Sequence, residues 1–325
     1  MEFEAAPVVD ALAVPQGNVR VAVIIPCYNE AIAIPKVVAD FRAALPGAVI
    51  YVYDNNSRDG TAEVARAAGA VVRREALQGK GNVIRRAFAD VDADLYVLVD
   101  GDDTYDAAAA PAMVELLRRE GLDMVNGARV TEIEHAYRPG HRLGNRVLTG
   151  MVRVVFGDRI SDMLSGYRVF SRRFVKSFPA LAGGFETETE FTVHALDLRM
   201  PVGEVATAYK DRPVGSASKL RTYSDGVRIL RTIVVLVKEE RPLQFFSICG
   251  LVLVAVAVAL GVPVVGEFLR TGLVPRLPTA VLAMGLVLVA ALSFTCGLVL
   301  DSVSRGRKEV KRLAYLAIPA PPALP

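Results

Sequence analysis

The sequence predicts an α/β fold, in which a mostly parallel sheet is covered by helices, followed by a C-terminal hairpin of two transmembrane helices. Two observations predict it. Short apolar segments alternate with helical segments through the first part of the chain, a pattern typical of a parallel sheet covered on both faces. Two long uncharged segments then lie close together near the C-terminus, and each is long enough to cross a bilayer.

The predicted strands are short and rich in β-branched residues, and a helical segment follows most of them. They lie at residues 19–25, 49–53, 70–72, 95–99 and 124–126. The predicted helices lie at residues 31–45, 61–68, 81–89, 107–120 and 191–198. Gly69 and Gly121 each follow one of these helices, and glycine commonly ends a helix. Residues 1–18, which are rich in Ala, Pro and Val, are expected to form a flexible arm ahead of a domain over residues 19–225.

The two uncharged segments, residues 243–265 and 278–300, contain 23 residues each. A helix of that length reaches about 34 Å, which exceeds the roughly 30 Å of the hydrocarbon core of a bilayer. Two buried core helices are the alternative, but adjacent uncharged runs of this length are rare in soluble folds. The sequence therefore predicts a transmembrane hairpin over residues 243–300.

Basic residues flank this hairpin at its outer ends and favour the cytoplasmic side of a membrane. The connecting segment, residues 266–277, holds only two of them, Arg270 and Arg276. We therefore expect a multi-pass protein of the inner cell membrane, with the α/β domain in the cytoplasm. Residues 226–242 are expected to form an amphipathic helix at the membrane surface, and residues 301–325 a basic cytoplasmic tail. The flanking basic residues are Arg228, Arg231, Lys238, Arg241, Arg305, Arg307, Lys308, Lys311 and Arg312.

The charge balance and the cysteine content exclude two further classes of protein. The chain has 38 Lys and Arg against 35 Asp and Glu, and the whole excess of three lies in residues 301–325, which hold five basic and two acidic residues. A nucleic-acid-binding domain carries a basic face, so no nucleic-acid partner is expected. Three cysteines are too few for a scaffold held by disulfides.

Polar clusters follow three of the predicted strands, at residues 28–30, 54–56 and 100–103. Ligands of such folds bind at the carboxyl ends of the strands. Asp100 and Asp102 are separated by one glycine, and two such carboxylates can hold a divalent ion that neutralises a diphosphate. No G-x-G-x-x-G follows the first strand and no G-x-x-x-x-G-K-[ST] occurs. A dinucleotide fold and a P-loop are therefore disfavoured.

Four segments carry a resemblance to a known family. They read VIIPCYNE at 23–30, YDNNSRDGT at 53–61, GKGN at 79–82 and DGD at 100–102. In order and spacing they resemble family 2 glycosyltransferases, whose GT-A fold has a mostly parallel, Rossmann-like sheet, over about residues 19–220. The segments SGYR at 165–168, DRP at 211–213 and SKL at 218–220 resemble the branch of dolichol-phosphate mannose synthase and bacterial polyprenyl-phosphate glycosyltransferases.

The resemblance implies a donor site for a nucleotide sugar. Asp100 and Asp102 would bind Mg²⁺ or Mn²⁺ beside the diphosphate. The metal motif of the synthase branch reads D-x-D-x-Q, whereas this chain has Thr104 in the last position. The residues implied to line the donor site are Pro26, Tyr28, Glu30, Asp54, Lys80 and Asp100.

Three alternating glutamates, Glu186, Glu188 and Glu190, precede the predicted helix at 191–198. They are expected to form its start, where carboxylates interact favourably with the helix dipole. The family places a catalytic or metal-adjacent carboxylate in this region. Glu190 aligns best with the synthase branch and Glu188 next best, and the sequence leaves the choice between them open.

The acceptor decides which further groups the enzyme needs. A hydroxyl acceptor requires a general base, whereas a phosphate is already ionised near pH 7 and requires cations that position it. The candidate cations are Arg129, Arg146, Arg212 and Lys219. Arg212 and Lys219 lie in the family-like stretch and, with Asp102 and Glu190, are the residues expected to be catalytic. The histidines, His135, His141 and His194, are expected at the surface or in packing roles.

The function expected from this resemblance is that of an inverting, metal-dependent glycosyltransferase. It would move a sugar from a UDP- or GDP-sugar to a polyprenyl phosphate at the cytoplasmic face of the membrane. One alternative is a hydroxyl acceptor on a glycolipid, a diacylglycerol or a polysaccharide, with Glu190 as the base. Another is an inactive, membrane-anchored binding partner. Gly250, Gly261 and Gly285 in the spans are candidates for contacts with membrane helices of a second copy in a homo-oligomer.

Overall fold

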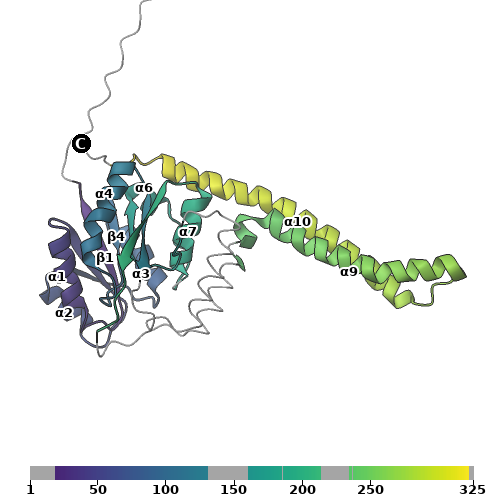
Figure 1. The fold of residues 1–325 in the computed structure, drawn as a ribbon, viewed down its shortest axis with the longest axis horizontal. Coiled ribbons are helices and arrows are strands. Elements are labelled where there is room, and N and C mark those ends of the chain that lie inside the picture. The colour runs from purple at the N-terminus through teal and green to yellow at the C-terminus, as the bar shows by residue number, and fades with distance from the viewer. Residues whose placement is uncertain (1–18, 131–159, 185, 214–233, 236, 322–325) are drawn as a thin grey trace, which may run out of the picture.

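The structure, a computed structural model, describes residues 19–130, 160–184, 186–213, 234–235 and 237–321. It consists of an α/β domain and a long hairpin of two helices that projects from it (Figure 1). Within these residues the sheet of the domain has seven strands in the order β3-β2-β1-β4-β6-β5-β7. The strands are β1 (Val21–Cys27), β2 (Val49–Asp54), β3 (Val71–Arg74), β4 (Leu95–Leu98), β5 (Met124–Val130), β6 (Arg168–Ser171) and β7 (Val202–Ala208).

The sheet is mostly parallel, as predicted. β1 pairs in parallel with β2 and β4, β2 with β3, and β5 with β7. Among the described strands, only β6 runs antiparallel, between β4 and β5. The carboxyl ends of β1, β2 and β4 therefore lie at the same edge of the sheet, where the three polar clusters follow them.

Two hydrophobic cores cover the two faces of this sheet, because successive strand residues point to opposite faces. Val23 and Ile25 of β1 pack on one face, and Ala22 and Ile24 pack on the other. The first core is covered by α1 (Ile34–Ala44), α2 (Thr61–Ala67), η1 (Ala107–Ala109) and α4 (Ala110–Glu120). The second is covered by α3 (Lys80–Asp90), α6 (Arg172–Ser177) and α7 (Thr187–Asp197).

Several boundaries differ from the predicted ones. β1 continues through Pro26 to Cys27, two residues beyond the predicted end. The pairing of β1 with β4 stops at Ile24, so the missing N–H of Pro26 removes no hydrogen bond between these two strands. β5 is longer than the predicted strand at 124–126, since it pairs with β7 over its whole length. Neither β6 nor β7 was predicted. The helix expected at 107–120 is divided into η1 and α4.

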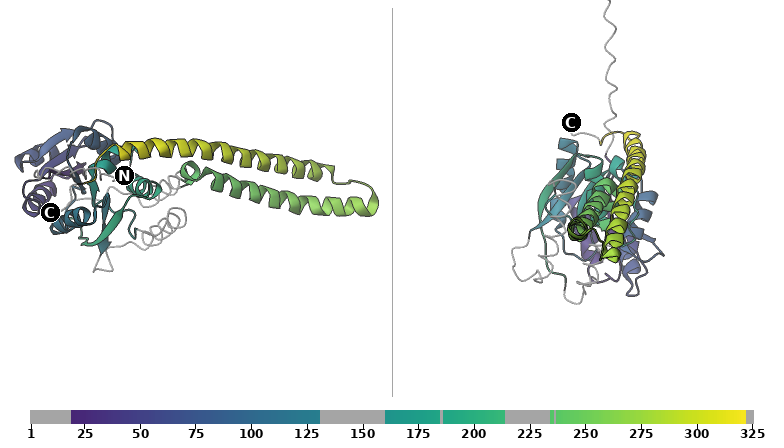
Figure 2. Two further views of the ribbon diagram at one scale, coloured as in Figure 1. Left: turned by 90° about the horizontal axis from the view of Figure 1, so that it is seen from above. Right: turned by 90° about the vertical axis from the view of Figure 1, so that its right-hand side faces the viewer.

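The hairpin consists of α9 (Pro242–Thr271) and α10 (Leu277–Leu316), which lie side by side (Figure 2). Both helices are long and apolar enough to cross a membrane, and only 17% of each apolar window is buried. Gly250 approaches α10 so closely that a Cβ there would lie 3.3 Å from the oxygen of Ala290. Gly261 also faces α10, whereas a Cβ at Gly285 would meet open space. Of the three glycines expected to contact a second copy, Gly250 and Gly261 thus face α10 of the same chain, and Gly285, which lies in α10 itself, is the one not covered by α9.

The segment predicted to be a basic tail is helical as far as Leu316 and contacts the α/β domain (Figure 1). Tyr315 donates a hydrogen bond of 2.8 Å to Oδ2 of Asp123, and its ring lies 4.7 Å from the guanidinium of Arg173. Lys308 Nζ lies 2.6 Å from Asp197 at the end of α7. The flexible arm expected at residues 1–18, most of the helix expected at 226–242 and the last four residues lie outside the described residues.

Candidate active site

The loops after β1 and β2 are tied together at the carboxyl edge of the sheet. Asn29 N donates to Ser57 Oγ at 2.9 Å, and Glu30 N donates to Thr61 Oγ1 at the same distance. Asn55 N donates to the carbonyl of Cys27 at 2.9 Å. These bonds hold the predicted donor residues on one rim, where Glu30 and Asp54 are buried and Tyr28 is 37% exposed. Pro26 lies in β1 opposite Tyr53 of β2.

Lys80, the first residue of α3, joins two carboxylates from distant parts of the chain. Its Nζ lies 2.5 Å from Asp100 Oδ1 and 2.5 Å from Glu188 Oε1. The side chains of Lys80 and Glu188 are 8% and 6% exposed. Burial lowers the pKa of Lys80, but the charges of Asp100 and Glu188 outweigh it and raise the pKa above its ordinary value. Lys80 therefore remains a cation at this site.

Asp102 is held by a second set of partners. Oδ2 lies 2.5 Å from Nη2 of Arg212, and Oδ1 accepts a 2.7 Å hydrogen bond from the hydroxyl of Thr104. Burial and the charge of Asp100 raise the pKa of Asp102, while Arg212 opposes that rise. Thr104 stands where the synthase branch has a glutamine, and it orients the Asp102 carboxylate.

Two glycines allow the backbone to approach the aspartate pair. A Cβ at Gly166 would lie 2.4 Å from Oδ2 of Asp100, and one at Gly101 would lie 2.6 Å from Sγ of Cys27. The N–H of Gly166 donates to the hydroxyl of Tyr105 at 2.8 Å. The segment before β6 is therefore fixed directly against the Asp100 carboxylate.

The charges at this edge suit a divalent ion. Asp100, Asp102 and Glu188 are faced by the two cations Lys80 and Arg212, which leaves one negative charge. Oε2 of Glu188 is buried without a hydrogen-bond partner among the described residues. Carboxylate oxygens are ligands that Mg²⁺ and Mn²⁺ prefer, so the donor set fits such an ion. The described residues hold no group of three or more His, Cys, Asp or Glu arranged for a metal, so an ion at Asp100 and Asp102 would need ligands from water or substrate.

The structure separates Glu188 from Glu190. Both lie in the first turn of α7, as predicted for the start of the helix. Glu190 points elsewhere, because its two oxygens accept hydrogen bonds from Leu181 N and Ala182 N at 2.9 and 3.0 Å. The carboxylate that the structure brings to Lys80 and Asp100 is that of Glu188, which places the better-aligned Glu190 outside this cluster.

The four candidate cations have different positions. Arg129 forms a bidentate ion pair with Asp162, at 2.7 and 2.9 Å, and this pair joins β5 to the segment before β6. Arg212 lies at the aspartate pair. Arg146 and Lys219 lie outside the described residues. Thr104, Tyr105 and Gly166 were not predicted as site residues, although the SGYR segment was a signal for Gly166.

The chain is similar in sequence to known proteins. The sequence model described as glycosyl transferase family 2 matches residues 22–178. Glycosyltransferase AglJ of Haloferax volcanii is 32% identical over 303 residues, which cover 91% of this chain and 98% of AglJ. The chain belongs to glycosyl transferase family 2. It is thus a glycosyltransferase, and the matched residues contain the clusters after β1, β2 and β4.

A further relative and a solved structure are similar to this family 2 enzyme. A dolichyl-phosphate hexose transferase of Haloferax volcanii is 28% identical over 220 residues, 68% of this chain and 95% of that protein. Glucosyl-3-phosphoglycerate synthase from Mycobacterium tuberculosis has a crystal structure in complex with Mn²⁺, UDP and glucosyl-3-phosphoglycerate. It has a TM-score of 0.54 and 21% identity, and the match covers 67% of this chain and 80% of that one. The domain therefore has the GT-A fold, as predicted.

Proposed function

We propose that this glycosyltransferase transfers a hexose from a UDP- or GDP-sugar to a polyprenyl phosphate, with inversion at the anomeric carbon. The observation that carries the proposal is the position of Arg212, whose Nη2 lies 2.5 Å from Oδ2 of Asp102. A guanidinium held beside the carboxylates of the donor site is suited to receive an anionic acceptor, because its planar fork matches a phosphate.

On the donor side, Asp100 and Asp102 would hold Mg²⁺ or Mn²⁺, which supplies positive charge to the departing nucleoside diphosphate when bound. Lys80 fixes the orientation of Asp100 and Glu188 through its two hydrogen bonds. Pro26, Tyr28, Glu30 and Asp54 lie on the rim that would receive the nucleotide. The solved relative that was crystallised with Mn²⁺ and UDP supports this arrangement.

On the acceptor side, the lipid phosphate needs no base, since it is already ionised near pH 7. Its oxygen forms a bond to the anomeric carbon while the bond from that carbon to the diphosphate breaks. Arg212 orients the attacking phosphate, and Lys219 is proposed to assist it. The name of the dolichyl-phosphate hexose transferase, which is 28% identical to this chain, supports a lipid phosphate as the acceptor.

The hairpin would serve this reaction by keeping the domain at the membrane. We propose that α9 and α10 cross the inner membrane and that the domain faces the cytoplasm, where basic residues are favoured. The acceptor lipid and the site then share one surface, which raises the chance that both substrates meet in an attacking geometry.

A hydroxyl acceptor is the second candidate, and one observation favours it. Burial raises the pKa of Glu188, with Asp100 adding to the rise and Lys80 opposing it, and Oε2 of Glu188 has no partner among the described residues. A carboxyl of that kind is suited to act as a general base. This role, first expected for Glu190, would fall to Glu188, because both oxygens of Glu190 are used by the backbone.

The test incubates membranes that contain the protein with labelled UDP- and GDP-sugars and Mg²⁺ or Mn²⁺, followed by extraction of the lipid fraction. A labelled product that mild acid cleaves, as expected for a sugar phosphate, supports the proposal. Arg212→Ala should abolish its formation more completely than Glu188→Gln does, and the reverse order would favour the hydroxyl acceptor. Absence of turnover with every donor, together with absence of metal-dependent donor binding, would overturn the proposal.

A further inference from the structure

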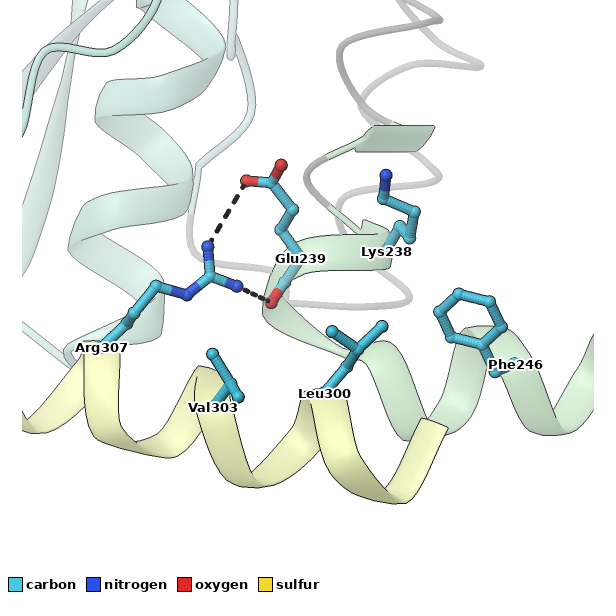
Figure 3. A pocket seen from close by; sticks show the side chains of 6 residues that line it. All are labelled: Lys238, Glu239, Phe246, Leu300, Val303 and Arg307. Carbon is cyan, nitrogen blue, oxygen red and sulfur yellow. Dashed lines mark hydrogen bonds and ion pairs between the residues drawn. The ribbon is translucent and has the colours of Figure 1, made fainter. Parts of the chain in front are cut away.

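A cavity of about 350 Å³ lies at the base of the hairpin, where the chain enters α9 and α10 leaves the apolar region (Figure 3). It is far from the carboxylate cluster in sequence and belongs to different elements. Its lining residues are Lys238, Glu239, Phe246, Leu300, Val303 and Arg307.

The lining has an apolar part and a charged part. Phe246, Leu300 and Val303 form the apolar part. On the charged side, Arg307 donates to the carbonyl of Glu239 at 3.2 Å, and its Nη1 lies 3.9 Å from the Glu239 carboxylate (Figure 3). Lys238 has no ion-pair or hydrogen-bond partner within the described part of the chain. The cavity therefore carries one net positive charge beside an apolar wall.

The position of the cavity along the hairpin indicates the level of the bilayer at which it would lie. The uncharged spans begin at Leu243 and end at Leu300, so the lining straddles the change from uncharged to charged residues. In a bilayer this level is the layer of lipid headgroups. Two neighbouring cations are tied to acidic residues of other elements, Lys308 to Asp197 and Lys311 to Glu240. Lys238 and Arg307 are the cations that line the cavity itself.

We propose that this cavity binds an anionic phospholipid of the bilayer, in addition to any lipid that serves as the acceptor. Lys238 and Arg307 bind the phosphate, and the first acyl carbons pack against Phe246, Leu300 and Val303. The volume is near the lower end of the roughly 300–1,000 Å³ of ligand pockets, which suits a headgroup and the adjoining carbons. Basic pockets between helices on the cytoplasmic side typically bind anionic headgroups, and the cation of a zwitterionic lipid would be repelled by Lys238.

The absence of tryptophan from the sequence allows a direct test. The full chain with Phe246→Trp is reconstituted in phosphatidylcholine vesicles that contain an equal mole fraction of either brominated phosphatidylglycerol or brominated phosphatidylcholine. The anionic lipid should be enriched about fivefold at the reporter over its bulk fraction and should quench its fluorescence more strongly. If Phe246→Trp fails to fold, Leu300→Trp places the reporter on α10.

Charge variants decide the outcome. Lys238→Gln should weaken the preference for the anionic lipid and Lys238→Glu should abolish it. Arg276→Gln, in the segment between the two spans, should retain it. Equal quenching by the two brominated lipids, or a preference that survives Lys238→Glu, would overturn the proposal. Loss of quenching on addition of a small fraction of polyprenyl phosphate would also overturn it, since the cavity would then belong to the acceptor. The inference rests on the proposed membrane-spanning hairpin, but the readout needs no catalysis and is therefore independent of the proposed transferase reaction.

Discussion

Lys80 Nζ lies 2.5 Å from Oε1 of Glu188, a residue 108 positions further along the chain. The same nitrogen lies 2.5 Å from Asp100. One ammonium group therefore connects the start of α3, the end of β4 and the start of α7. The carboxylate cluster depends on this cation, because a buried carboxylate without a partner is strongly disfavoured.

Replacement of Lys80 by methionine should destabilise the protein and abolish transferase activity. It would leave Glu188 buried without its cation, a change that typically costs about 3–5 kcal/mol. Lys36→Met is the matched control, since Lys36 also contacts two aspartates but is 54% exposed, and exposed pairs contribute at most about 1 kcal/mol. Denaturant unfolding of the detergent-solubilised protein measures the free energy of unfolding of both variants. Equal losses of stability in Lys80→Met and Lys36→Met would contradict the role of Lys80 as the buried cation of the cluster.

Glu188→Gln and Glu190→Gln should have different consequences. Glu188→Gln should reduce the turnover number strongly, because it removes a charge from the cluster with Lys80 and Asp100. Glu190→Gln should mainly lower the midpoint of thermal unfolding, because a glutamine can accept only one of the two hydrogen bonds from Leu181 and Ala182, and a typical hydrogen bond contributes about 0.5–1.5 kcal/mol. A strong loss of turnover with an unchanged midpoint in Glu190→Gln would return the catalytic role to that residue.

Gly166→Ala should weaken metal-dependent binding of the donor. The added methyl group would lie 2.4 Å from the Asp100 carboxylate and displace it. Titration with Mn²⁺ at a fixed donor concentration measures this, and we expect the half-saturating concentration to rise at least about tenfold, which corresponds to about 1.4 kcal/mol. Gly285→Ala, whose methyl group meets open space, should behave as the unchanged protein. Unaltered Mn²⁺ dependence in Gly166→Ala would show that the aspartate tolerates the shift.

The buried histidine should make stability depend on pH. Burial, together with the charge of Lys311, lowers the pKa of His194 to about 3, compared with about 6.5 in the unfolded chain. The stabilisation by neutral His194 is complete above pH 6.5 and is lost as the pH falls toward 3, by about 2 kcal/mol at pH 5. Urea unfolding at pH 7 and pH 5 should show a smaller loss in His194→Gln than in the unchanged protein. Identical losses would exclude this contribution.

The strands β1, β2 and β4 were predicted to within a few residues of their bounds. Each is an apolar run that ends in a polar cluster, and this pattern can be recognised from the local sequence alone. β6 was missed because two of its four buried residues, Arg168 and Ser171, are polar, so it lacks the continuous apolar run by which the equally buried β4 was recognised. β7 was missed because its residues are mostly half-buried and its pairing with β5 joins segments that are far apart in the sequence.

The site was predictable in its residue types and less so in its geometry. Glu188 and Glu190 stand two positions apart in one helical turn, so they point about 200° apart around the helix axis, and no local pattern shows which of them faces Lys80. Arg129 resembled a free phosphate ligand because its partner Asp162 lies 33 positions away. Contacts of this kind depend on the tertiary fold.

The helix α10 has 40 residues, about 60 Å at 1.5 Å per residue, and contains both the second apolar span and the residues Lys308 and Tyr315 that grip Asp197 and Asp123. The helix has no proline after Pro278, so no proline kink separates the apolar span from the residues that contact the α/β domain. If α10 crosses a bilayer as proposed, a change in bilayer thickness would change the tilt of this helix, and the contact of Lys308 with Asp197 would transmit that tilt to α7. In the proposed arrangement, the thickness of the bilayer would therefore set the height of the active site above the membrane surface.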